Sequence, residues 1–378
     1  MTTLEDFVQL SKLDATNERQ AVSQLFTPLT IRSTTFHNRA WVSPMCQYSA
    51  TDGVVGAWHL VHLGSFATGG SGLVMAEASA VNAEGRISIA CPGLYTDEQV
   101  AAWRTITNFI HSQSTVAGIQ LAHAGRKATT MRPWDNHLIA TADEGGWQSV
   151  APSAIAFDGY PVPRELSVPE IDALVWDFAS AAKRAVTAGF DVLEIHAAHG
   201  YLLHEFLSPL SNQREDEYGG SLENRSRFLM RVAHAVRSSI GEQMPLFVRI
   251  SASDYTPGGW DIDESVSLAS QLRESGVDLI DVSSGGNVAH AQIPIGPGYQ
   301  VPFAREIREN AAIPTAAVGL INDASQAEQI LSEGSADAVF LARAYLRNPR
   351  WAMSAAEELG EVIDWPVQFD RARTLRTS

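Results

Sequence analysis

Residues 191–201, Asp-Val-Leu-Glu-Ile-His-Ala-Ala-His-Gly-Tyr, are a short apolar run that ends in two histidines, a glycine and a tyrosine. A run of this length between two helix-like patterns predicts a parallel strand that is buried on both faces. In an α/β barrel the polar carboxyl end of such a strand lies where the βα loops converge, so His196, His199 and Tyr201 are the first candidate site residues. One histidine alone would indicate a structural role, but three such groups favour a site that binds an oxygen and supplies a proton. Residues 202–225 follow without a clean period, which predicts a loop over that site.

The same strand pattern recurs along the chain and alternates with helical patterns. The predicted strands are 40–47, 72–78, 116–122, 192–196, 246–251, 279–283, 315–319 and 338–342. Between them, Ser167 and Glu170 predict a helix capping box, and Gly189 predicts the end of that helix. The residues 323–326 repeat the box. Eight strand–helix units favour a closed (β/α)₈ TIM barrel over an open doubly wound sheet.

The remaining segments are assigned around this barrel. Residues 1–24 are expected to be an N-terminal extension, and residues 25–378 a single barrel domain. A β-hairpin that begins at Leu25 and turns at Ser33–Thr34 is expected to plug the bottom of the barrel. Residues 129–166, rich in Pro, Gly and Trp, predict a lid-like insertion after the third strand.

The composition narrows the classes of function. The chain has 378 residues, 45% of them hydrophobic, and a formal net charge of −16. That acidity argues against nucleic acid or an anionic membrane as a partner. Only Cys46 and Cys91 are present, so no disulfide framework and no iron–sulfur cluster is expected, and a cytoplasmic location fits best.

The ends of the predicted strands supply the other candidate site residues. They contain few carboxylates, which argues against a glycosidase, because that class of enzyme needs a pair of acidic residues. They also lack the ligand set of a typical metal-dependent hydrolase, so no metal site is predicted. His59 and His62 are three residues apart on an amphipathic helix, and packing is the favoured reading for both. Cys91 is expected to be a small buried hydrophobe.

The late strands suggest a phosphate site. Barrels often bind phosphate with the loops after strands seven and eight, where Gly319 permits close backbone approach and Arg343 offers a fork of donors. The chain has no Gly-x-Gly-x-x-Gly motif, so a nicotinamide dinucleotide has no Rossmann domain of its own here.

Five stretches together resemble one known family. They are SPMCQYSA at 43–50, GIQLAHAGRK at 118–127, APSAIAF at 151–157, EIHAAHGYLLHEFLSPLSNQREDEYGGSLENR at 194–225 and FVRISASD at 247–254. Over about residues 25–371 the chain is similar to the Old Yellow Enzyme family, in the thermophilic-like branch with the bacterial ene-reductases and xenobiotic reductases. The resemblance implies a barrel with tightly but non-covalently bound FMN, which oxidises NADPH or NADH and reduces the activated C=C bond of an enone.

The resemblance also implies roles for individual residues. The isoalloxazine ring is expected against Ser43, Pro44, Met45, Cys46, Ala78, Gln120 and Arg249. The ribityl phosphate is expected against Ser283, Gly285, Gly319, Ala342 and Arg343. At Ala342 the family more usually has glycine.

For the substrate, the resemblance implies that His196 and His199 hold the carbonyl oxygen and that Tyr201 delivers the proton. Cys46 resembles a cysteine that tunes the flavin, and Tyr48 and Lys127 would contact the substrate. Arg371 resembles an arginine that reaches into the active site of a neighbouring subunit, which implies a homodimer or a tetramer of dimers.

Three alternatives stay open at this point. Nitro or other xenobiotic reduction would use the same flavin site. A metal-dependent aldolase or hydrolase would use His196 and His199 as ligands. A barrel that only stores flavin or serves as a scaffold would need no proton donor at Tyr201.

Overall fold

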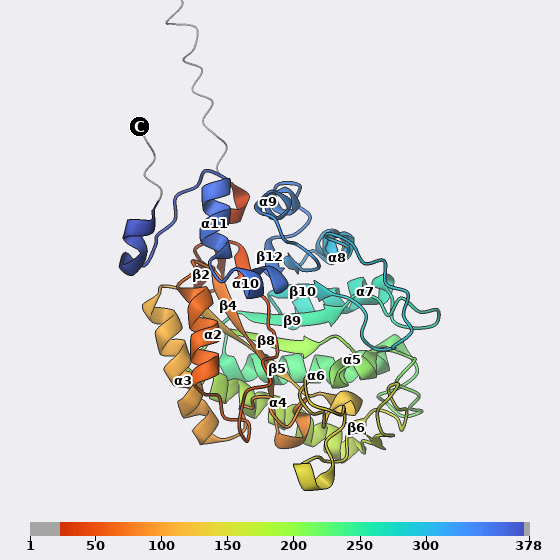
Figure 1. The fold of residues 1–378 in the computed structure, drawn as a ribbon. Helices are drawn as coiled ribbons and strands as arrows, with labels where there is room; N and C mark the ends of the chain where they lie inside the picture. The colour runs from red at the N-terminus through yellow and green to blue at the C-terminus, as the bar shows by residue number, and fades with distance from the viewer. Residues whose placement is uncertain (1–22, 374–378) are drawn as a thin grey trace, which may run out of the picture.

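The chain folds into a closed barrel of parallel strands with helices around it (Figure 1). The computed structural model describes residues 23–373, so nearly all of the predicted extension 1–24 lies outside the described residues. The barrel strands are β3 (Ala40–Val42), β4 (Leu73–Ala80), β5 (Val116–Ala122), β8 (Val192–Ala197), β9 (Leu246–Ser251), β10 (Leu279–Ser283), β11 (Thr315–Ala317) and β12 (Ala338–Leu341). The barrel closes where β12 pairs with β3, with Phe340 opposite Trp41. All eight predicted strands and the (β/α)₈ class are therefore confirmed.

Helices surround the barrel and cover the outer faces of its strands. They are α2 (Ala57–Ala67), α3 (Asp97–Ser112), α4 (Val168–Ala188), α5 (Leu202–Leu207), α6 (Leu222–Ile240), α7 (Ile262–Glu274), α8 (Val301–Ala311), α9 (Ala324–Ser332), α10 (Arg343–Arg347) and α11 (Trp351–Glu358). Short 3₁₀ turns are η1 (Gln24–Phe26), η2 (Ala83–Gly85), η3 (Gly125–Lys127), η4 (Ala142–Glu144) and η5 (Val367–Ala372). No helix within residues 23–373 is long and apolar enough to cross a membrane.

The predicted helix ends are right for α4 and only partly right for α9. The Ser167 amide donates to Glu170 Oε2 at 2.8 Å, and Gly189 ends α4 with φ +89°. Helix α9 starts after Asp323 as expected, but the Asp323 side chain makes no capping hydrogen bond. Instead, Gln326 Oε1 accepts the amide of Asn322 at 3.1 Å.

A hairpin made of β1 (Leu29–Ile31) and β2 (Thr34–Phe36) packs against one end of the barrel. Phe36 is fully buried, and its ring lies 4.6 Å from Trp41, which stacks on Phe247 at 5.8 Å. These aromatics fill the barrel at the end opposite to the carboxyl ends of the strands. The turn is Arg32–Ser33, one residue earlier than predicted.

Two predicted strands extend two residues or more beyond the observed ones, and both observed strands end for a local reason. β3 stops at Val42, because Pro44 has no amide hydrogen with which to continue the ladder. β11 stops at Ala317, and Gly319 has φ +118°, which is outside the strand region. At both places the chain leaves the sheet and turns across the mouth of the barrel.

The segments expected to cover the site are more structured than predicted. Residues 202–207 form the buried helix α5 and not a loop, because its leucines and Phe206 all face the core. The insertion 129–166 contains a small parallel ladder of β6 (Val150–Ala151) and β7 (Arg164–Glu165). At the other end of the chain, η5 extends away from the barrel beyond α11 (Figure 1).

Candidate active site

The side chains of His196, His199 and Tyr201 meet at the carboxyl end of β8. His199 Nδ1 lies 3.4 Å from His196 Nε2, and the ring of Tyr201 lies 5.1 Å from the ring of His196. The second nitrogen of His199, Nε2, is 2.7 Å from Ser283 Oγ at the end of β10. The trio that the sequence singled out therefore forms one group at the barrel mouth.

A tight turn places this trio. His199 has φ +60° and Gly200 has φ +69°, both in the left-handed region. A side chain on residue 200 would come within 2.3 Å of the carbonyl oxygen of Gly286, so only glycine fits. The strained turn is held by a hydrogen bond of 2.9 Å from the His199 amide to Ser251 Oγ.

The site holds these groups in their neutral forms. Burial lowers the pKa of both imidazoles well below the ordinary value, and the positive charge of Arg249 lowers it further. Near pH 7 each ring therefore offers one N–H donor and one acceptor nitrogen. Burial raises the pKa of the Tyr201 phenol well above its ordinary value, so the phenol keeps its proton.

Lys127 ties the third strand to this group. Its ammonium donates to the carbonyl oxygens of His199 and Gly286 at 2.8 and 2.9 Å. It also lies over the rings of Phe157, at 4.6 Å, and Tyr201, at 5.2 Å. Burial lowers the pKa of Lys127 to about 8. The insertion thus contacts the site through Phe157.

A buried polar chain runs through the barrel below the trio. Gln120 Nε2 donates to Glu194 Oε1 at 2.7 Å, and the carboxyl of Glu194 interacts with that of Asp281. Asp281 Oδ2 lies 3.2 Å from Arg249 Nε. Arg249 Nη1 donates to Ser43 Oγ at 3.1 Å. The chain links four strands to the segment that follows β3.

Glu194 and Asp281 were missed by the sequence analysis. Burial, with the charge of Asp281, raises the pKa of Glu194 well above its ordinary value, so Glu194 carries the proton that the two carboxyls share. Burial also raises the pKa of Asp281, to about 6, against the opposing charge of Arg249. Near pH 7, Asp281 therefore neutralises Arg249. Acidic residues inside strands expected to be buried on both faces were the available signal.

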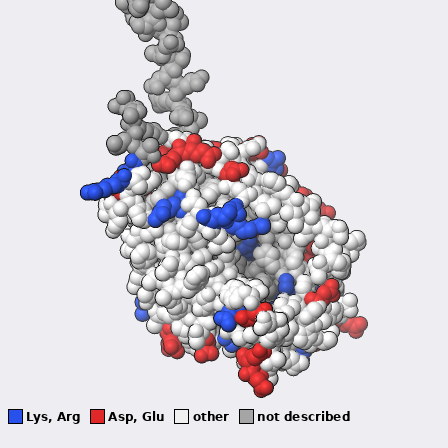
Figure 2. Space-filling view, in the orientation of Figure 1, with Lys and Arg blue, Asp and Glu red and all other residues white. Residues whose placement is uncertain are grey.

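A cavity of about 160 Å³ opens beside Arg249. Its walls include the predicted residues Arg249, Ser283, Gly319, Ala342 and Arg343. Gln300, also in its wall and also missed, accepts a hydrogen bond of 2.6 Å from Ser284 Oγ and donates to the carbonyl of Val318 at 3.1 Å. Gly285 is not in this wall; its carbonyl accepts a hydrogen bond from Ser251 Oγ at 2.8 Å. Figure 2 shows a hollow near the middle of one face with basic side chains at its edge.

The segment after β3 lies on the opposite side of the trio. Cys46 and Tyr48 pack with Tyr201 against a small apolar cluster that contains Ala78 and Cys91. Pro44 is half-buried, and Met45 packs against the main core. The ring of Tyr48 meets that of Trp134 from the insertion edge-on at 5.9 Å.

Other predicted residues lie apart from this group. Arg371 is exposed on η5, in the segment that follows α11 and extends away from the barrel, which we call the C-terminal arm. His59 is fully buried against Trp103, and His62 packs edge-on against Phe66, so their structural role is confirmed.

The described residues offer no third ligand for a metal ion bound by His196 and His199. Within residues 23–373, one group of three potential metal ligands of the His, Cys, Asp and Glu types has its ligand atoms within 4.8 Å of one another. That group is Cys46, Glu77 and Cys91, and it contains neither His196 nor His199.

Comparison with known proteins gives a consistent result. The profile of the NADH:flavin oxidoreductase / NADH oxidase family matches residues 24–361. An NADPH dehydrogenase of Geobacillus sp. (strain WCH70) is 49% identical over 352 residues, which cover 92% of this chain and 98% of that protein. The NADPH dehydrogenase of Bacillus subtilis (strain 168) is 49% identical over 351 residues, with the same coverage. The structure of morphinone reductase superposes with a TM-score of 0.76 at 28% identity and covers 92% of both chains.

Proposed function

Because the chain belongs to the NADH:flavin oxidoreductase / NADH oxidase family, an Old Yellow Enzyme-type family of FMN-dependent oxidoreductases, we propose that it is an ene-reductase. Its substrates would be α,β-unsaturated carbonyl compounds. The observation that carries this proposal is the meeting of two neutral imidazoles and a protonated phenol, His196, His199 and Tyr201, at the barrel mouth. A site of such donors suits a substrate that presents one carbonyl oxygen and needs one proton.

The described residues fit FMN. His196 Nδ1 is a buried polar atom without a hydrogen-bond partner, and such atoms normally have one. The side-chain amide of Gln120 can pair with the pyrimidine edge of the isoalloxazine ring, because that edge presents both donors and acceptors. The ring would lie against Ser43, Pro44, Met45, Cys46, Ala78, Gln120 and Arg249, and the phosphate end against Ser283, Gly285, Gly319, Ala342 and Arg343. When bound, FMN supplies hydride transfer, from the nicotinamide to the flavin and then to the substrate.

His196 and His199 would donate their N–H groups to the substrate carbonyl oxygen. Because both rings are neutral, they polarise the carbonyl without placing a full charge on it, and the β-carbon becomes electrophilic. Ser283 Oγ, at 2.7 Å from His199 Nε2, and Ser251 orient His199 for this task. Arg249 supplies the fixed positive charge below them, with Asp281 as its counterion.

Tyr201 would give its proton to the α-carbon. A phenol with a raised pKa holds its proton until a strongly basic carbon develops beside it, which restricts the transfer to the activated substrate. Tyr48 and Lys127 would line the substrate space from either side, together with Phe157 of the insertion.

One space would serve both reactants in turn. No dinucleotide-binding motif is present in the sequence, so nicotinamide and enone would alternate over the same flavin face in a ping-pong cycle. The relatives named NADPH dehydrogenase support NADPH as the reductant. We infer further that the enzyme is a cytoplasmic homodimer or a tetramer of dimers, in which Arg371 reaches the site of the neighbouring subunit.

Product analysis with initial rates tests this proposal. With NADPH and 2-cyclohexenone the product should be cyclohexanone, and double-reciprocal plots at several enone concentrations should give parallel lines. Intersecting lines would contradict the shared site. Turnover of a nitroarene without any turnover of the enone would replace the ene-reductase assignment by nitro reduction.

A further inference from the structure

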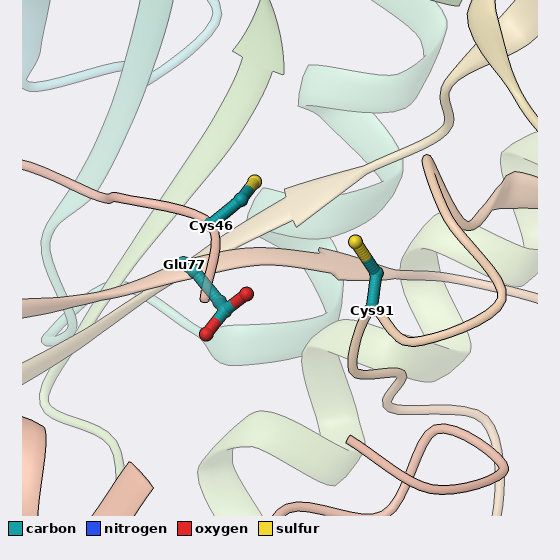
Figure 3. A group of neighbouring side chains, drawn as sticks. All are labelled: Cys46, Glu77 and Cys91. Carbon is teal, nitrogen blue, oxygen red and sulfur yellow. The ribbon is translucent and has the colours of Figure 1, made fainter. Parts of the chain in front are cut away.

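The two cysteines of the chain meet at one place although they are 45 positions apart in the sequence. Cys46 follows β3, and Cys91 lies in the irregular segment between η2 and α3. Their sulfur atoms are within 4.8 Å of each other. Figure 3 shows the two side chains with Glu77, each contributed by a different segment of the chain.

A carboxyl group completes this cluster. Glu77 projects from β4, is almost fully buried, and has a carboxylate oxygen within 4.8 Å of both sulfurs. Its Oε2 accepts the amide of Gln47 at 2.8 Å, and its Oε1 lies 3.4 Å from His59 Nε2. Burial raises the pKa of Glu77, so this carboxyl is a better proton acceptor than an exposed one. The Glu77 carboxylate is therefore fixed in position beside the two thiols, where it can act as a base.

The two thiols differ in access. Cys46 is partly exposed at the site, whereas Cys91 is 1% exposed. Even with the isoalloxazine ring against it, Cys46 packs with Tyr48 and Tyr201 at the space proposed for the substrate, so a small oxidant would reach Cys46 before the sheltered Cys91. Both residues lie outside helices and strands, so their backbones can adjust to the sulfur–sulfur distance of about 2.0 Å in a disulfide.

We propose that Cys46 and Cys91 form a reversible intramolecular disulfide when the protein meets a hydroperoxide, with Glu77 as the proton acceptor. In the first step the Cys46 sulfur attacks the O–O bond, which breaks to give a Cys46 sulfenic acid and water or an alcohol. In the second step Cys91 attacks that sulfur, forms the S–S bond and releases water. Two thiols are oxidised by two electrons, and one peroxide is reduced.

The cluster also sets the speed of this reaction. The neighbouring Cys91 thiol, burial and the charge of Glu77 raise the pKa of the Cys46 thiol well above its ordinary value. The reactive thiolate is therefore scarce near pH 7, and oxidation should be slow there and accelerate as the pH rises. The pair would respond to sustained oxidation and not to brief exposure.

Mass spectrometry of the purified holoenzyme tests this proposal. The reduced protein is incubated with hydrogen peroxide, denatured, and treated with iodoacetamide. The expected product carries no alkyl group, is lighter than the reduced protein by two hydrogens, and yields a cross-linked peptide that joins residues 46 and 91. Dithiothreitol should restore both thiols. Two alkylatable thiols after oxidation, or a Cys46 sulfinic acid beside a free Cys91, would overturn the proposal.

Variants separate the roles of the three residues. In Cys91→Ser the reaction should stop at the Cys46 sulfenic acid, which dimedone traps; Cys91→Ala serves if the serine variant does not fold. Glu77→Gln should slow disulfide formation about tenfold or more, as expected for loss of a general base. An unchanged rate in Glu77→Gln would remove the carboxyl from the proposal. The cross-link does not depend on the reaction proposed above, so each can fail without the other.

Discussion

At the residue scale, Tyr201 is the side chain on which the proposed reaction depends most. Its phenol is half-buried beside His196 and under the ammonium of Lys127, and its raised pKa keeps it protonated near pH 7. It therefore has one chemical task in the cycle, which is to give a proton to carbon. Hydride transfer from the nicotinamide does not need it.

Changing Tyr201→Phe should slow the reaction of the reduced enzyme with 2-cyclohexenone about 10²- to 10⁴-fold, the usual value of a general acid. Flavin reduction by NADPH should stay within about twofold of wild type, and stopped-flow absorbance measures both steps. Tyr345→Phe is the control, because Tyr345 packs on Phe66 and its hydroxyl donates to the carbonyl of Ala40, at the end of β3 opposite to the trio. Equal slowing of both half-reactions in Tyr201→Phe would remove the proton-donor role.

The depressed pKa of Lys127 should make the free energy of unfolding depend on pH. Burial holds its pKa at about 8, and an unfolded lysine titrates near 10.4. Between these values the unfolded chain binds more protons than the folded one, so this group makes the free energy of unfolding rise with pH from about 8 to about 10.4. In Lys127→Met that rise should be smaller than in wild type, as measured by urea unfolding across the range. The same slope in both proteins would contradict a buried, depressed lysine.

At the element scale, the hairpin β1–β2 is expected to close the barrel bottom through Phe36. Phe36→Ala should lower the free energy of unfolding by about 3–5 kcal/mol, because it opens a cavity against Trp41 and Phe247. Thermal unfolding measures this, and Phe109→Ala on the half-open surface of α3 is the control. A Phe36→Ala protein as stable as the control would show that the hairpin does not support the barrel.

The sequence was informative about elements and weaker about what lies inside them. Eight apolar runs with helices between them were sufficient to predict every barrel strand. The ends of β3 and β11 were wrong, since Pro44 and the positive φ of Gly319 stop pairing before the apolar run ends. Helix α5 was missed because its six residues are too few to show a period against the polar stretch that follows.

The candidate site, too, could be predicted from the sequence only in part. His196, His199 and Tyr201 stand together in the sequence, and their meeting could be predicted from one strand end. The chain from Gln120 through Glu194 and Asp281 to Arg249 depends on the register of neighbouring strands, in which Glu194 lies opposite Gln120 and Asp281 opposite Arg249. Register across a barrel is a tertiary property, so no single segment of sequence contains it.

At the scale of the whole molecule, the C-terminal arm packs little against the rest of its own chain. η5 has no buried residue, and its contacts include Phe369 under Arg350 at 4.4 Å. An apolar and basic arm of this kind suits a neighbouring subunit. If Arg371 enters that subunit's site, Arg371→Ala should raise the KM for the enone about tenfold and leave flavin reduction unchanged, as expected for loss of one charged hydrogen bond.

Arg373→Ala is the matched control for this change, because Arg373 pairs with Asp370 and Trp365 within the same arm. Sedimentation velocity should give a dimer or larger species for both variants. A wild-type protein that sediments as a monomer, or an unchanged KM in Arg371→Ala, would contradict the role of the arm.

The measurement that tests the central claim most directly is the visible absorption spectrum of the purified protein through one anaerobic cycle. The proposal predicts flavin bands that bleach on addition of NADPH and return in full on addition of 2-cyclohexenone. Bands that bleach with NADPH and do not return with the enone would contradict the ene-reductase function, and a protein that shows no flavin bands even after FMN is added would contradict the cofactor site itself.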